Sequence, residues 1–233
     1  MGMRSEGARR ASQLRWAAAG GAAFVVSYSA HRLLQGAGPE GTDAAAVSEW
    51  IVAQRGALLA SEIALGVALL AFLGFVAPLV DVLQREVGTL VAAGFAVAGA
   101  VFIAMGLVSN AAETALFSTD GGELVAIEVL DGLQRRIPNV LAAAMLGGAL
   151  APAFLRGALA WRWVGFASVA AAALFFLGYV SGVVGSNPES GASVFGVAIF
   201  VIWMALVCTA LWVTARREDR VPNSTPAGNG ELK

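Results

Sequence analysis

The chain has 233 residues, of which 58% are hydrophobic and 13% are charged, and its formal net charge is −1. Soluble domains carry about 25% charged residues, so the low charged fraction indicates a chain that lies in lipid. Membrane spans of about 20 residues each would use nearly the whole length, so no separate soluble domain is expected. The near-neutral charge and the lack of a long basic segment argue against nucleic acid as a partner.

The chain opens on a basic tail, residues 1–15, and an apolar stretch at 16–34 predicts the first membrane span. A basic segment before an apolar run is also typical of a signal peptide, and Ser27, Tyr28 and Ser29 offer a small-x-small cleavage site. We favour the uncleaved span, because the apolar run continues past that site and because pairing of the spans then places both tails on one side.

Residues 36–55 are acidic and rich in glycine, and they predict a short helix capped by Thr42 or Asp43. Its apolar residues recur at i, i+3 and i+4, and Trp50 is one of them. This pattern predicts an interfacial helix that lies flat on the outer membrane surface, with Trp50 at the level of the lipid headgroups.

Five further apolar stretches predict spans two to six, at about 56–80, 88–108, 137–155, 164–184 and 192–214. The predicted fold is therefore all-α: a polytopic bundle of six transmembrane helices with the short outer interfacial helix. Residues 16–214 form this single domain, between the basic tail 1–15 and a polar tail, 215–233, that is expected to be disordered.

The positive charges predict the orientation of the six spans. With the N-terminus inside, the inner segments hold eleven of the lysines and arginines and the outer segments hold four. Since positive charge accumulates in cytoplasmic loops, we expect a multi-pass protein of the cell (inner) membrane with both termini cytoplasmic. Lys233 is the only lysine, and the bias toward Arg, Ala, Gly and Val is typical of GC-rich bacterial coding.

Two stretches carry a resemblance: R-W-A-A-A-G-G-A-A-F-V-V, which opens the first span, and S-E-W-I-V-A-Q-R-G-A-L-L, which ends the outer helix. They resemble a group of bacterial six-helix membrane proteins catalogued only as a domain of unknown function. The spacing of spans is similar through about Thr214. The resemblance implies the six-helix layout and brings no catalytic residues.

Polar side chains at the outer ends of the spans form a candidate pocket. Its seven members are His31, Glu62, Asn110, Glu113, Glu128, Asp131 and Arg135. An acidic residue within a span, such as Glu62, costs about 2.5–3.5 kcal/mol to insert, so it is expected to face the bundle interior and to be paired, protonated or hydrated. The pocket would bind a cation or relay protons.

Each of these residues also has a plainer interpretation. Glu62 can be a hydrogen-bonded interior carboxyl. For His31 we favour an interfacial side chain that reaches toward water, although histidine also suits a proton sensor. The charges of 113–135 can belong to a solvated helix face with charge partners one or two turns away, and we favour that interpretation for them.

One histidine and one cysteine, Cys208, exclude bis-histidine haem ligation and a His-rich or multi-Cys zinc site, so we expect no cofactor and no metal. No Ser-His-Asp set is recognisable, which argues against an enzyme. The first hypothesis is a non-enzymatic accessory, sensory or packing protein; the alternative is a small transporter or an ion- or proton-conducting protein that uses Glu62 and the outer carboxylates. The lipid bilayer is the expected partner. A homo-oligomer and a partner membrane protein are both open alternatives, and the sequence does not identify a ligand.

Overall fold

The structure is a computed structural model that describes residues 2–36, 43–118, 124–134, 139–184 and 192–220. Within these ranges the chain is all-helical. The helices are α1 (Gly2–Gln35), α2 (Ala44–Glu86), α3 (Thr89–Phe117), α4 (Leu124–Gln134), α5 (Asn139–Leu155), α6 (Arg162–Val184) and α7 (Ala192–Arg220).

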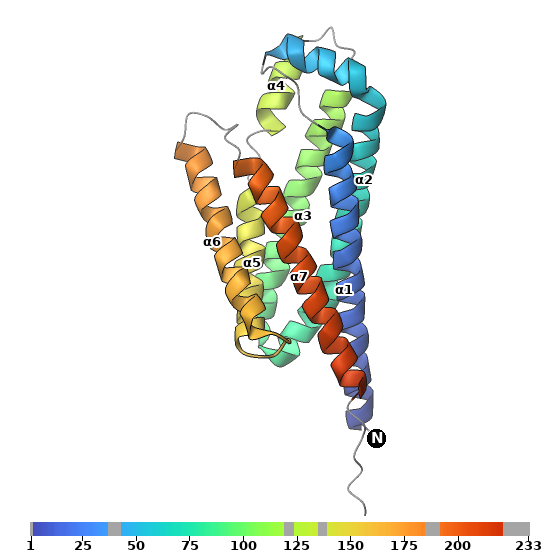
Figure 1. Cartoon of the computed structure of the whole chain (residues 1–233), viewed down its shortest axis with the longest axis vertical. Coiled ribbons are helices and arrows are strands. Elements are labelled where there is room, and N and C mark those ends of the chain that lie inside the picture. Colours follow the sequence, from blue (N-terminus) through green and yellow to red (C-terminus); the bar gives the residue numbers. More distant parts are fainter. Residues whose placement is uncertain (1, 37–42, 119–123, 135–138, 185–191, 221–233) are drawn as a thin grey trace, which may run out of the picture.

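The long helices run up and down along one axis (Figure 1). α1 packs along α2 and α7, α3 packs against α2 and α5, and α5 pairs with α6. The short helix α4 lies at the upper end, against α2 and α3. The start of α1 and the end of α7 lie together at the lower end, so the two ends of the helical chain share one side of the bundle (Figure 1).

Four helices, α2, α3, α6 and α7, are long and apolar enough to cross a membrane. α5 is apolar but shorter, with 17 residues. Large apolar side chains point outward from the helices, among them Leu70, Leu90 and Phe166, each at least 65% exposed. Outward apolar surface of this kind is typical of helices that face lipid. The four helices are compatible with a membrane protein and support the predicted membrane localisation.

Aromatic rings fill the centre of the bundle. Phe24 of α1, Phe72 of α2 and Phe102 of α3 lie with ring centroids 4.7–5.9 Å apart, and Phe200 of α7 completes the group at 5.3 Å from Phe102. Offset and edge-on ring pairs add about 0.5–1.5 kcal/mol each beyond their buried area. This cluster fixes how α1, α2, α3 and α7 face one another, and it lies directly below the polar residues described in the next subsection.

The start of α2 differs in one respect from the sequence expectation. Asp43 caps the helix as predicted, and its carboxylate accepts a hydrogen bond from the Ala46 backbone nitrogen at 2.8 Å. The helix does not end before Gly56 but continues without a break to Glu86. A single glycine costs a helix only about 1 kcal/mol, which its long apolar continuation offsets.

The first turns of α2 lie across the upper end of the bundle before the helix turns down beside α1 (Figure 1). Their apolar face packs on protein: Val47 and Ile51 are buried, and the Trp50 ring lies 5.8 Å from that of Phe117. The amphipathic pattern was therefore recognised correctly. A place in the lipid interface for this segment stays a prediction.

The lower end of the bundle is held by ion pairs around Arg10 of α1. Its Nε lies 3.0 Å from Glu86 of α2, its guanidinium also pairs with Glu218 of α7, and Nη2 donates to the carbonyl of Ala158 at 2.7 Å. One arginine side chain thus joins α1, α2, α7 and the connection between α5 and α6.

Candidate functional site

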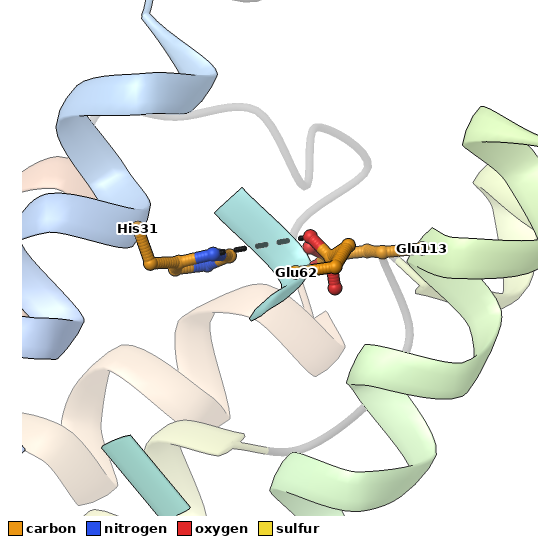
Figure 2. A group of neighbouring side chains, drawn as sticks. All are labelled: His31, Glu62 and Glu113. Atoms are coloured by element: carbon orange, nitrogen blue, oxygen red, sulfur yellow. Dashed lines mark ion pairs between the residues drawn. The ribbon is translucent and has the colours of Figure 1, made fainter. Parts of the chain in front are cut away.

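Three helices bring three ionisable side chains together inside the upper half of the bundle. His31 comes from α1, Glu62 from α2 and Glu113 from α3, and one ligand atom of each lies within 4.8 Å of the others. Figure 2 shows the imidazole pointing from α1 toward the two carboxyls. All three side chains are buried, with relative exposures of 3%, 6% and 4%. We call this group the His–Glu–Glu cluster.

The imidazole of His31 is held in place by its neighbours. Nδ1 lies 3.0 Å from the Ser61 carbonyl oxygen, to which it donates a hydrogen bond, and 3.8 Å from Oε1 of Glu62. The Tyr28 ring, one turn earlier on α1, lies 5.8 Å from the imidazole ring. The ring therefore faces α2 rather than the water beyond the end of α1.

Glu62 receives hydrogen bonds from two helices. Asn110 of α3 donates its side-chain nitrogen to Oε2 at 2.8 Å and to the Glu62 backbone carbonyl at 3.0 Å. The Ser61 hydroxyl lies 3.1 Å from Oε1. Asn110 thus ties α3 to α2 at the level of the cluster, and it orients the carboxyl toward His31 and Glu113.

Glu113 is bound from α1 and from its own helix. Gln35 donates its amide nitrogen to Oε2 at 2.7 Å, and the Ser109 hydroxyl lies 3.3 Å from Oε1. The amide oxygen of Gln35 accepts a hydrogen bond from the exposed guanidinium of Arg32 at 2.7 Å. A chain of hydrogen bonds therefore runs from the surface arginine through Gln35 to the buried carboxyl.

The cluster lies between two apolar layers. Below it is the aromatic core, which Tyr28 joins through its ring contact with Phe24. Above it is a smaller apolar group made by the start of α2, the end of α3 and α4, in which Leu58, Leu116 and Ile127 are buried. Charge in such surroundings is costly, at several kcal/mol for each unpaired ion.

The two carboxyls set the chemistry of the cluster. Ligand oxygens of Glu62 and Glu113 lie within 4.8 Å of each other. Two ionised carboxylates this close in apolar surroundings repel each other strongly, so the pair requires something positive between them, either a proton or a metal cation. Buried carboxylates and one imidazole, brought from three helices, are a donor set suited to binding a cation.

The structure brings together four of the seven residues predicted for the pocket: His31, Glu62, Asn110 and Glu113. Glu128 is exposed on α4 and takes no part in the cluster. The side chain of Asp131, and Arg135 altogether, lie outside the described residues.

Sequence reasoning missed Gln35, Ser61 and Ser109. A periodic signal was present for two of them, because Gln35 follows His31 by four residues and Ser109 precedes Glu113 by four, which places each pair on one helix face.

No family model, no curated protein and no solved structure matches this chain.

Proposed function

We propose that this chain is an ion-handling membrane protein, a small transporter or channel that binds a cation at the His–Glu–Glu cluster. One observation carries the proposal: Glu62 and Glu113, from different helices, face each other in the bundle interior beside an imidazole. Ionisable groups within membrane spans are expensive and mark ion or proton pathways by default. The site lies in the upper half of the bundle, close to one membrane surface.

The proposed topology has six spans, α1, α2, α3, α5, α6 and α7, with α4 and the start of α2 at the outer surface. α5 is the shortest span, and its 17 residues reach about 25 Å at 1.5 Å per residue, close to the hydrocarbon thickness of a bilayer. Both termini are proposed to be cytoplasmic in the inner membrane. Support comes from the arginine asymmetry and from the meeting of the two helical ends at one side of the bundle.

A packing role is the second candidate, and the hydrogen bonds themselves favour it. Gln35 and Ser109 donate hydrogen bonds to Glu113, and Asn110 donates one to Glu62, so the cluster also holds α1, α2 and α3 together. In that case the protein would be an accessory subunit without ion flux, and the polar groups would serve only to fix helix register.

Flux through reconstituted protein separates the two candidates. Full-length protein is placed in liposomes, and entry of Na⁺, K⁺, Ca²⁺, Mn²⁺ and Zn²⁺ is followed with ion-sensitive dyes. We expect at least one of these ions to enter faster than into empty liposomes, and Glu62→Gln and Glu113→Gln each to abolish the difference. Glutamine keeps the shape and much of the hydrogen bonding but cannot balance a cation.

The matched control is Glu128→Gln, which removes an exposed carboxylate of α4 and should leave the flux unchanged. If none of the five ions enters faster with the wild-type protein, ion handling is excluded and the packing role remains. Flux that persists in both cluster variants would exclude the cluster as its pathway.

A further inference from the structure

We infer that the cation is a divalent transition metal, held by the His31 imidazole and one carboxylate oxygen from each of Glu62 and Glu113. This inference rests on the proposed function, because it names the ion that the same site takes. It departs from the expectation of no metal, which considered only sites with several histidines or cysteines.

The positions of the ligand atoms fit such an ion with a small adjustment. With metal–ligand bonds of about 2.0–2.2 Å, neighbouring ligands of a tetrahedral ion lie roughly 3.4 Å apart. Nδ1 of His31 and Oε1 of Glu62 are already 3.8 Å apart, and every ligand pair lies within 4.8 Å. The remaining distance is at most about 1.4 Å, which rotation about the side-chain bonds of the glutamates can close.

The kinds of ligand select the ion. Na⁺, K⁺, Mg²⁺ and Ca²⁺ prefer shells made of oxygen alone, whereas imidazole suits Zn²⁺, Fe²⁺ and their neighbours. Two carboxylates and a neutral imidazole carry a charge of −2, which a divalent ion balances. A monovalent ion would leave a net charge of −1 in the apolar surroundings of the cluster, which is costly, whereas a divalent ion leaves none.

The surroundings of the two glutamates are those of metal ligands. Asn110 and Ser61 orient Glu62, and Gln35 and Ser109 orient Glu113. Outer hydrogen bonds of this kind fix the ligands of bound metals.

Without metal, Nδ1 of His31 carries the proton that bonds the Ser61 carbonyl. To ligate through Nδ1, the neutral ring changes to the tautomer with its proton on Nε2, and the Ser61 carbonyl loses that hydrogen bond. Three protein ligands leave a coordination position open, which suits an ion that must enter and leave.

Direct metal binding tests the inference without any measurement of flux. The full chain is purified without a polyhistidine tag, and Zn²⁺ binding is measured by titration calorimetry. We expect one Zn²⁺ per chain, with affinity lowered at least 10–100-fold in His31→Gln and in Glu113→Gln, as for loss of a ligand or of its support. Glu128→Gln is the control, and thermal unfolding verifies that each variant is folded.

The single histidine makes a second readout specific. With Mn²⁺ bound, pulsed electron paramagnetic resonance should show coupling to an imidazole nitrogen, and only His31 can supply it. Zn²⁺ binding that all variants retain, or a Mn²⁺ signal without the nitrogen coupling, would overturn the assignment. If Zn²⁺ does not bind but Na⁺ or Ca²⁺ flux still requires Glu62, the transition-metal inference fails and the proposed function stands. Without either binding or flux, both fail.

Discussion

Glu62 and Glu113 lie on different helices and yet face each other inside the bundle, with ligand oxygens within 4.8 Å. The contact depends on the register of α2 against α3, which Asn110 fixes through its two hydrogen bonds to Glu62. Two acidic groups are therefore kept close by neutral amides, Asn110 on one side and Gln35 on the other. That arrangement holds the two carboxyls in place without adding a charge beside them.

Asn110→Ala should destabilise the protein by about 1–3 kcal/mol, because it leaves Glu62 buried without its amide donor. The measurement is chemical unfolding of the purified protein in detergent. Thr209→Ala is a matched control, since the exposed Thr209 hydroxyl bonds only its own helix, at Ala205, among the contacts the structure describes. Its effect should stay within about 0.5 kcal/mol. Equal effects of the two substitutions would contradict the role of Asn110 between α2 and α3.

Much of this architecture could be predicted from the sequence, and the limits have a physical reason. Apolar runs located the long helices, and the cost of an intramembrane carboxyl predicted that Glu62 faces inward, near His31 and Asn110. For Glu113 the favoured interpretation, a solvated helix face, was wrong, because its side chain is buried. The rotation of each helix about its axis is decided by packing between helices, as between Phe72 and its partners, and no run of residues encodes it locally. That is why the supporting amide of Gln35 was missed.

The close approach of α1 and α2 gives a second test, at Gly20. A Cβ atom there would lie 2.6 Å from the backbone carbon of Gly74, too close for α2 to stay in place. Gly20→Ala should therefore cost about 1–3 kcal/mol of stability. Gly66→Ala is the control, because a Cβ at Gly66 meets nothing within 4 Å, and it should stabilise α2 by up to about 1 kcal/mol. Stabilisation by both would show that the two helices pack less tightly.

Arg10→Ala should open the lower end of the bundle, where this side chain joins Glu86, Glu218 and the Ala158 carbonyl. About a quarter of the arginine side chain is exposed, so we expect a loss of about 1–3 kcal/mol, below the 3–5 of a fully buried pair. Arg85→Ala breaks an exposed pair within α2 and should cost less than about 1 kcal/mol. Unfolding at several salt concentrations measures both, and a larger loss in Arg85→Ala would contradict the importance of Arg10.

The orientation in the membrane can be tested at the two ends of α2. Cys208 is the only cysteine and is buried, so Cys208→Ala provides a background without thiols. Glu49→Cys, in the first turns of α2, should react with an impermeant maleimide in intact cells. Gln84→Cys, at the lower end, should react only after the membrane is opened. Both positions are exposed in the structure. The reverse pattern would place the termini outside.

Glu62→Leu tests whether this carboxyl faces the interior of the bundle. A leucine that faced lipid would remove the cost of an intramembrane carboxyl and stabilise the protein. In the structure the same change leaves Asn110 and the Ser61 hydroxyl without the carboxyl they contact, and it removes the group opposite Glu113.

Replacing one member of a buried polar network leaves the remaining polar groups without a hydrogen-bond partner. We therefore expect Glu62→Leu to destabilise the protein by about 1–3 kcal/mol. Ile63→Leu, at the neighbouring and largely exposed position, is the control and should change stability by less than about 0.5 kcal/mol. Thermal and chemical unfolding in detergent supply the comparison. A clear rise in stability for Glu62→Leu would refute the interior placement, and the proposed cation site would fall with it.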